Sequence, residues 1–219
     1  MKAAVKNKRS LKRVGKGGRP TKAREGEISD QILATAGGMF ANQGYAATSV
    51  EQVALACAAG KDTIYRRYPS KRALFDAVVE RLRIKVLERL DDVVLAEKGE
   101  PRTQLERIAR WFLTINLDPE LVALRRIAFT EAGLKTESSS PAAGDPIFQR
   151  LVDIVAASQA AGILQAGDPT FIAMQLINAV VVGPTNEAML GRSTYASIAD
   201  QDAYFEKAWA LFMSGAQPR

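Results

Sequence analysis

The sequence predicts an all-α protein of about nine helices. Apolar residues recur at helical spacing along most of the chain, strand-like alternation is weak, and Gly- or Pro-containing breaks separate the periodic segments. With 219 residues, 47% of them hydrophobic, the chain can enclose a small domain joined to a larger one. We expect a basic arm over 1–23, a small helical domain over 24–70 and a larger one over 71–219.

The first helix is expected to follow the arm and to end at Gly44, because glycine is the usual residue just past a helix C-terminus. Gly37 and Gly38 inside it each cost about 1 kcal/mol relative to alanine, and we interpret them as positions of close packing against another helix. One face of this helix carries Ile28, Ile32, Leu33, Ala36, Met39 and Phe40.

A short second helix follows. Thr48 or Ser49 can cap its first turn, and the carboxylate of Glu51 offsets the helix dipole there. Cys57 lies on its apolar face, where we expect core packing because free cysteine is commonly buried. A single cysteine also excludes an internal disulfide.

A turn over 58–60 leads to another short helix over 61–68, which Pro69 ends because the residue before a proline avoids the helical region. Ser70 then caps a long helix that runs to about residue 96. The Gly183-Pro184 pair should kink the helix expected over 169–190. The later helices are expected at about 102–117, 119–134, 146–161, 169–190 and 201–214.

The helix over 61–68, after its turn, has the pattern of the second helix of a helix-turn-helix. Such a helix fits the major groove of DNA, where its N-terminal residues reach base edges. Asp62 can accept a hydrogen bond from a cytosine amine, but the favoured interpretation is that it caps the helix N-terminus, where a carboxylate is stabilising. Since Arg66 and Arg67 point to different faces, at most one of them serves the groove. The candidate base contacts are Lys61, Asp62, Thr63 and Arg66.

Phosphate contacts are expected beside these residues. The hydroxyls of Tyr65 and Tyr68 can donate to phosphates, and one of the two tyrosines should also pack into the small core. Lys71 opens the long helix, where its ammonium and the free backbone N–H groups can hold a phosphate. Each charge taken singly is more often a solvated side chain, but together they indicate a DNA-binding face.

The basic arm suggests a second mode of DNA contact. Residues 1–24 hold ten Lys or Arg and no acid, whereas the remainder carries 20 basic and 24 acidic residues. Arg19, in a Gly-Gly-Arg-Pro context, can enter a narrow minor groove. The alternative is a solvated tail, which would still raise nonspecific affinity for DNA.

Composition argues against several other functions. With no histidine and one cysteine, the chain lacks an ordinary zinc-ligand set and the catalytic triads that need histidine. It also lacks a phosphate loop and a nucleophile elbow, so we expect neither an enzyme nor a cofactor or metal. The most apolar stretch, 171–183, is too short to span a bilayer, and the N-terminus has no signal-peptide pattern. We expect a cytoplasmic protein without membrane contact.

The segment GYAATSVEQVALACAAGKDTIYRRYPSKRALF, from Gly44 to Phe75, resembles the DNA-binding domain of the tetracycline-repressor (TetR) family. The sequence departs from that family at Ala58, where glycine is usual, and at Gly60, where Ser or Thr is usual. A left-handed alanine costs about 1 kcal/mol, and a glycine cap loses only about a few tenths. The family pattern is matched at Gly44, Tyr45, Thr48, Val53, Ala54, Lys61, Thr63, Tyr65, Tyr68, Lys71 and Leu74.

The resemblance implies a ligand-responsive transcriptional regulator and favours a repressor, one that binds a palindromic double-stranded DNA operator as a homodimer. A small apolar or amphipathic effector would release it. Thr48, Tyr65 and Lys71 would contact phosphates while 61–63 face bases, and the dimer would form through about 169–190 and 201–214.

The effector pocket of this family is commonly surrounded by the helices of the larger domain. Asn186 and Glu187 can lie at the pocket or at the dimer seam. The candidate pocket residues, for each of which a core position is the favoured interpretation, are Trp111, Phe112, Ile115, Arg126, Phe129, Phe148, Met174 and Asn178.

A different class of function is a nonspecific, nucleoid-type DNA binder driven by the arm. It predicts that deletion of 1–24 abolishes DNA binding and that a palindrome is bound no better than random DNA. The compact motif after the arm favours the regulator.

Overall fold

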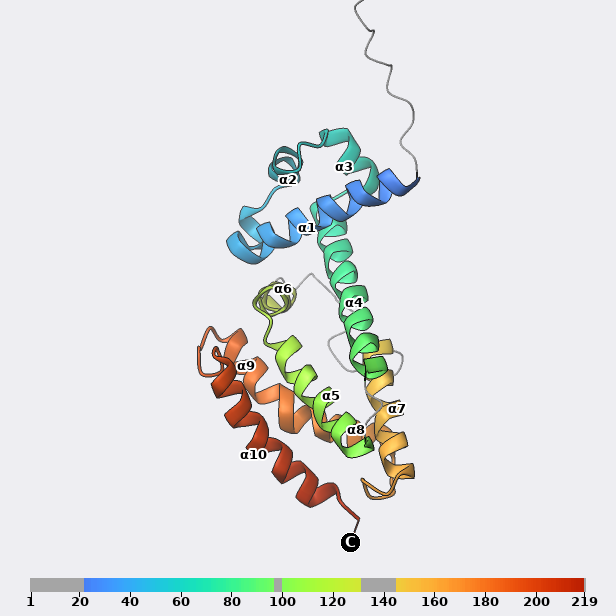
Figure 1. The fold of residues 1–219 in the computed structure, drawn as a ribbon. Coiled ribbons are helices and arrows are strands. Elements are labelled where there is room, and N and C mark those ends of the chain that lie inside the picture. The colour runs from blue at the N-terminus through green and yellow to red at the C-terminus, as the bar shows by residue number, and fades with distance from the viewer. Residues whose placement is uncertain (1–21, 97–99, 131–144, 219) are drawn as a thin grey trace, which may run out of the picture.

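The structure is a computed structural model that describes residues 22–96, 100–130 and 145–218. Every regular element in these residues is a helix, and α8, the π-helical segment η1 and α9 are continuous, so that the described part holds nine helices if they count as one. This confirms the all-α prediction. The elements are α1 (Lys22–Ala47), α2 (Val50–Ala56), α3 (Lys61–Arg67), α4 (Lys71–Ala96), α5 (Pro101–Asn116), α6 (Pro119–Thr130), α7 (Pro146–Ala160), α8 (Pro169–Ile177), η1 (Asn178–Val182), α9 (Gly183–Met189) and α10 (Ile198–Ala216) (Figure 1).

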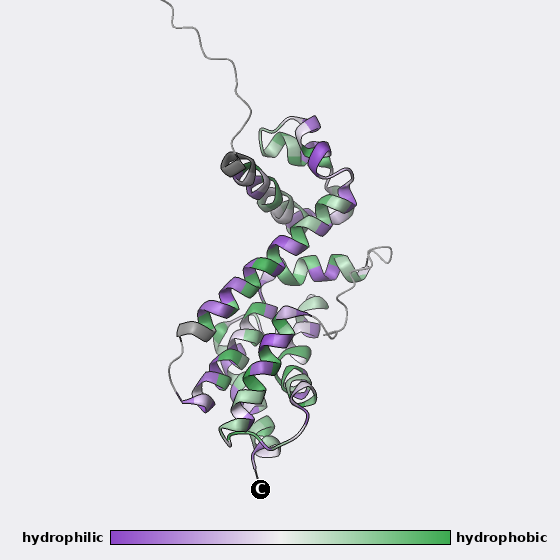
Figure 2. Cartoon of the chain, turned by 90° about the vertical axis from the view of Figure 1, so that its right-hand side faces the viewer, coloured by the Kyte–Doolittle hydropathy of each residue, from purple (hydrophilic) through white to green (hydrophobic). Residues whose placement is uncertain are grey.

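The helices form two ends joined by α4. Helices α1 to α3 lie together at one end, α4 runs away from them, and α5 and α7 to α10 pack at the other end (Figure 1). Most helices carry both hydrophobic and hydrophilic residues, as amphipathic helices require (Figure 2). No helix in the described part is long and apolar enough to cross a membrane.

Each end has its own hydrophobic core. The larger is built from the end of α4 with α5, α7, α8, η1 and α10. The smaller contains Phe40 of α1, Ile64 of α3 and Phe75 of α4, together with Leu124 and Ile127 of α6. Helix α6 therefore belongs partly to the core of the N-terminal end, although it lies far beyond residue 70 in the sequence.

The packing of α1 explains one of its two internal glycines. A Cβ atom at Gly37 would lie 2.9 Å from Glu120 Oε1 on α6 and 3.2 Å from Val78 Cγ1 on α4, so close packing is confirmed there. At Gly38 the prediction is wrong, because an added Cβ would meet nothing within 4 Å.

The predicted helix ends follow from local hydrogen bonds. Ser49, rather than Thr48, caps α2: its hydroxyl accepts from the Gln52 N–H at 3.1 Å, and the Gln52 side chain accepts from the Ser49 N–H at 2.7 Å. Ser70 accepts from the Ala73 N–H at 3.0 Å at the start of α4. Gly44 interrupts the helix with a φ of 85°. Each of these ends is set by residues no more than four positions apart.

The structure has the π-helical segment η1 directly before Gly183-Pro184, the pair at which a kink is expected. In a π-helical pattern the carbonyl of Ala179 would accept from the N–H five residues later, which is residue 184, and proline has none. The hydroxyl of Tyr204, on α10, donates to this carbonyl at 2.7 Å. A tyrosine from another helix thus takes the place of the missing backbone donor.

Candidate nucleic-acid interface

The turn between α2 and α3 sets the position of the candidate reading helix. Ala58 adopts the left-handed conformation, with a φ of 51°, at a cost of about 1–2 kcal/mol for a residue with a Cβ atom. The N–H of Ala59 donates to the Ala54 carbonyl at 2.9 Å and closes the end of α2. Ile64 is fully buried and anchors α3 to the small core. The turn keeps the backbone that glycine would favour.

Glu51 of α2 ties together two of the predicted DNA contacts. Its Oε1 lies 3.2 Å from Lys61 Nζ and accepts a hydrogen bond from the Tyr65 hydroxyl at 3.1 Å. A bond with its own backbone N–H and then those from Lys61 and Tyr65 lower the pKa of Glu51, and donation to Glu51 raises the pKa of Tyr65. Lys61 and Tyr65, one helical turn apart, are therefore held side by side. The sequence pattern gave no sign of this contact and indicated only a dipole role for Glu51.

Two of the other predicted phosphate contacts, Lys71 and Thr48, have internal acceptors in this structure. Lys71 Nζ donates to the Ala46 carbonyl at 3.2 Å and lies 4.3 Å from the centre of the Tyr45 ring. Thr48 is only 1% exposed, and its hydroxyl donates to the Gly44 carbonyl at 2.8 Å. Tyr68 packs against the small core, as expected for one of the two tyrosines.

The candidate base contacts lie on α3. Lys61, Asp62 and Arg66 are exposed and Thr63 is half-buried. Gly60 is the N-cap residue and no side chain caps the first turn, so Asp62 contributes there only as a charge near the helix N-terminus.

Of the paired arginines, Arg67 turns back to α1, where its Nη1 donates to Ser29 Oγ at 2.8 Å. This leaves Arg66 as the arginine on the exposed side of α3. Arg19 lies outside the described residues.

A cavity of about 300 Å³ opens beside the turn between α5 and α6. Pro119 and Val122 of α6 face it, opposite Pro184 and Ala188 of α9 and Tyr195 of the following loop. Asn186 and Glu187 do not line it; Glu187 pairs with Arg192 at 2.7 Å.

The eight candidate pocket residues do not line this cavity. Phe112 and Phe148 are buried in the larger core, and Trp111 and Met174 pack against it. Ile115 is half-buried, whereas Arg126, Phe129 and Asn178 are exposed. The Arg126 guanidinium donates to the Ala188 carbonyl at the cavity wall, at 3.0 Å.

The continuous helix from α8 to α9 presents exposed apolar side chains. Phe171 is 61% exposed and Val182 39%, and Leu190, which directly follows α9, is 69% exposed. Residues 169–186 carry no charge, and on α10 Leu211 is 75% exposed. Exposed apolar side chains at helical spacing are typical of surfaces that another helix covers.

The chain is similar to known regulators in both halves. Residues 32–78 match the family model of bacterial regulatory proteins of the tetR family, and residues 103–215 match that of the C-terminal domain of AefR-like transcriptional repressors. No curated protein matches.

Solved structures agree with these matches. A putative TetR-family transcriptional regulator from Mesorhizobium loti is 25% identical with a TM-score of 0.77, over 89% of this chain and 99% of that chain. The flavonoid-responsive regulator FrrA is 27% identical with a TM-score of 0.61, over the same shares. A putative regulator from Saccharomonospora viridis in complex with choline is 18% identical with a TM-score of 0.68, over 89% and 100%, a likeness of fold.

Proposed function

The chain belongs to the tetR family of bacterial regulatory proteins, and we propose that it is a repressor that binds a palindromic operator as a homodimer. A small apolar or amphipathic effector would release it from the operator. The observation that carries the proposal is the exposed side of α3, where Lys61 and Tyr65 are held together beside Asp62 and Arg66. Action on DNA would place the protein in the cytoplasm.

On DNA, Lys61, Asp62, Thr63 and Arg66 would face bases and Arg19 would enter the minor groove. The phosphates would be contacted by Thr48, Tyr65, Tyr68 and Lys71. Some of these hydrogen-bond donors would have to exchange an acceptor within the protein for a phosphate oxygen. The Tyr65 hydroxyl would leave Glu51 for a phosphate oxygen, and Thr48 would leave the Gly44 carbonyl. Lys71 can keep its bond to Ala46 and still donate to a phosphate, since an ammonium has three donors.

The exposed apolar side chains of α8 to α9 and the exposed Leu211 of α10 support a dimer through these helices. In the dimer, the two α3 helices would lie about 34–36 Å apart, which is the spacing of successive major grooves. We propose that the DNA-binding unit and the effector and dimerisation unit divide near Lys71, where α4 begins.

Helix α6 supports a route from effector to DNA. Pro119 and Val122 line the cavity, whereas Leu124 and Ile127 on another face of the same helix pack in the small core. A ligand that moves α6 would therefore shift α1 and the helices attached to it, together with α4. Release requires that the effector bind the shifted state more tightly than the operator-bound state.

The test is selection of binding sites from a random DNA pool by the full chain, followed by titration of the enriched site. We expect a palindrome, and we expect Tyr65→Ala and Lys71→Ala to lose specific binding. Lys85→Ala, an exposed residue of α4 away from α3, should bind as the unaltered chain does. Unchanged specific binding in both test variants would refute the proposed interface.

Deletion of residues 1–21 separates this function from a nonspecific binder. A repressor should keep its preference for the palindrome and lose part of its salt dependence. Loss of all binding, with no preference for the palindrome in the full chain, would instead favour the arm-driven binder.

A further inference from the structure

Arg125 of α6 carries a partly buried charge that no carboxylate balances among the described residues. Its Nη2 donates to the amide oxygen of Asn116 at 2.6 Å, where α5 meets α6. Burial alone lowers the pKa of Arg125, with no acid acting in the opposite direction. Asp118, at the start of the same helix, caps it by accepting from the N–H groups of Glu120 and Leu121 at 3.0 and 3.1 Å.

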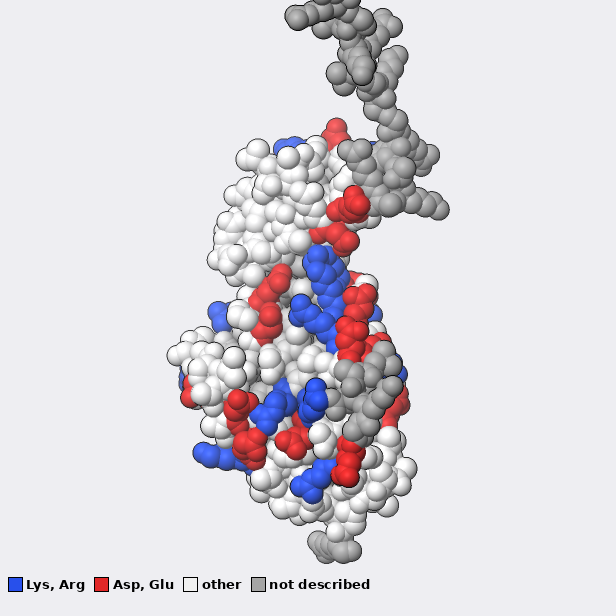
Figure 3. Space-filling model, in the orientation of Figure 1, with Lys and Arg blue, Asp and Glu red and all other residues white. Residues whose placement is uncertain are grey.

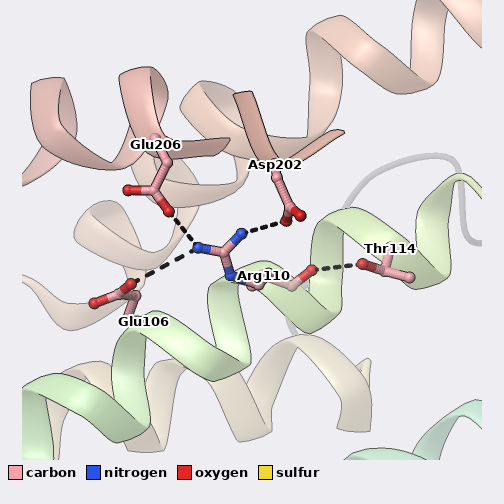
Figure 4. Close-up of polar contacts among 5 residues, drawn as sticks. All are labelled: Glu106, Arg110, Thr114, Asp202 and Glu206. Atoms are coloured by element: carbon pink, nitrogen blue, oxygen red, sulfur yellow. Dashed lines mark hydrogen bonds and ion pairs between the residues drawn. The ribbon is translucent and has the colours of Figure 1, made fainter. Parts of the chain in front are cut away.

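Other arginines of the same end of the molecule do have counter-charges. Arg110 contacts Asp202 at 2.6 Å, Glu206 at 2.5 Å and Glu106 at 3.8 Å (Figure 4). Arg150 and Arg192 each pair with a carboxylate, at 2.6 and 2.7 Å. Acidic and basic side chains lie next to each other over much of this face (Figure 3). Because a buried charge needs a counter-charge more than an exposed one does, the absence of a carboxylate partner for Arg125 among the described residues is unexpected.

Asn116 lies where the guanidinium of Arg125 finds a neutral amide oxygen rather than a carboxylate. The amide nitrogen of Asn116 donates to the Phe112 carbonyl at 2.8 Å, which fixes its oxygen toward Arg125. A guanidinium has five N–H donors, so Arg125 can still bind an anion through two of them.

We propose that the effector of this regulator carries a carboxylate, and that Arg125 binds this carboxylate between α5 and α6. The inference rests on the proposed function, because it names the chemical class of the ligand. A carboxylate bound to Arg125 would also connect the ligand to α6, whose Leu124 and Ile127 lie in the core of the DNA-binding end.

Calorimetric titration of the full chain with matched pairs tests this inference. The probes are decanoate with 1-decanol and 3-phenylpropanoate with 3-phenylpropanol, which differ in the anionic group. We expect the better carboxylate to bind about tenfold more tightly than its alcohol, the discrimination that a charged hydrogen bond supplies. Arg125→Met should abolish that preference and leave alcohol binding intact.

Two further variants keep the result interpretable. Arg125→Lys retains the charge without the planar fork, and should keep a reduced preference for the carboxylate. Arg102→Met, the matched control on α5, removes an exposed guanidinium outside the candidate pocket residues and should leave the preference unchanged. Equal affinity within each pair, a preference that survives Arg125→Met, or failure of both carboxylates to bind would overturn the inference.

None of these titrations contains DNA. Loss of sequence-specific DNA binding would refute the proposed function while leaving a carboxylate preference in place. A regulator that binds its operator but shows no preference dependent on Arg125 would refute only the inference about the effector.

Discussion

Replacement of Tyr204 by phenylalanine should destabilise the larger core through one backbone carbonyl. The Tyr204 hydroxyl donates to the Ala179 carbonyl at 2.7 Å, and this carbonyl faces position 184 in the π-helical pattern. Removal of the hydroxyl takes this donor away, and position 184 cannot replace it because Pro184 has no N–H. Replacement of Pro184 by alanine restores a donor, so it should reduce the cost of Tyr204→Phe.

The magnitude follows from the partial burial of this contact. A net hydrogen bond contributes about 0.5–1.5 kcal/mol, and an acceptor left buried and unsatisfied costs about 1–3 kcal/mol. Because Tyr204 is half-buried, we expect Tyr204→Phe to lower the free energy of unfolding by about 1–2 kcal/mol. At this chain length each kcal/mol shifts the melting temperature by about 2–4 °C.

The assay is a double-mutant cycle. Urea unfolding is followed by circular dichroism for four proteins: the unaltered chain, Tyr204→Phe, Pro184→Ala and the double variant. All four are measured at one protein concentration, because self-association would change the apparent stability. We expect a coupling of about 1 kcal/mol between the two positions. Tyr195→Phe is the control, because its ring lies 5.0 Å from that of Tyr204 but does not reach the Ala179 carbonyl by a hydrogen bond.

An equal cost of Tyr204→Phe in both backgrounds would refute the reasoning. It would mean that the hydroxyl does not substitute for the missing N–H of Pro184. A cost of Tyr195→Phe as large as that of Tyr204→Phe would likewise assign the effect to ring packing rather than to the carbonyl.

Gly37→Ala should lower the free energy of unfolding by about 1–3 kcal/mol, since its Cβ would lie 3.2 Å from Cγ1 of the buried Val78. Gly38→Ala should raise it by about 0.4–1 kcal/mol; equal urea midpoints would contradict the close packing. Ala58→Gly should raise the melting temperature, because the left-handed φ of 51° would no longer be strained, and a lower temperature would contradict this. Glu51→Gln should return the raised pKa of Tyr65 toward its ordinary value, measured by ultraviolet absorbance against pH. Because the pKa of Glu51 is lowered, its contribution to stability exists above the ordinary carboxyl pKa, about 4.3, and is lost as the pH falls through the lowered pKa, so the two chains should converge in acid.

Local features of the chain were predictable because they depend on near neighbours in the sequence. Ser49 and Ser70 cap helices through N–H groups three residues later, and Gly44 interrupts α1 by its own backbone freedom. The strain foreseen at Ala58 is also local, since the turn geometry is set within a few residues. The exposed character of Lys61 follows from helical periodicity in the same way.

Contacts between distant segments were not predictable from periodicity. Glu51 holds both Lys61 and Tyr65, which requires the crossing of α2 over α3. Apolar spacing marks Leu124 and Ile127 as buried, but it does not say that they join the core of the N-terminal end. For the same reason the pattern did not separate Gly37 from Gly38.

The sequence by itself determined the helices, their ends, the helix-turn-helix and the basic arm, because each is encoded in residues within a few turns of one another. Only the tertiary structure decided which donors are already engaged, as with Thr48 and Lys71, and which charge is left without a counter-charge, as with Arg125. The physical reason is that hydrogen bonding and desolvation depend on which helix faces meet in space. A one-dimensional pattern specifies the faces but not their partners.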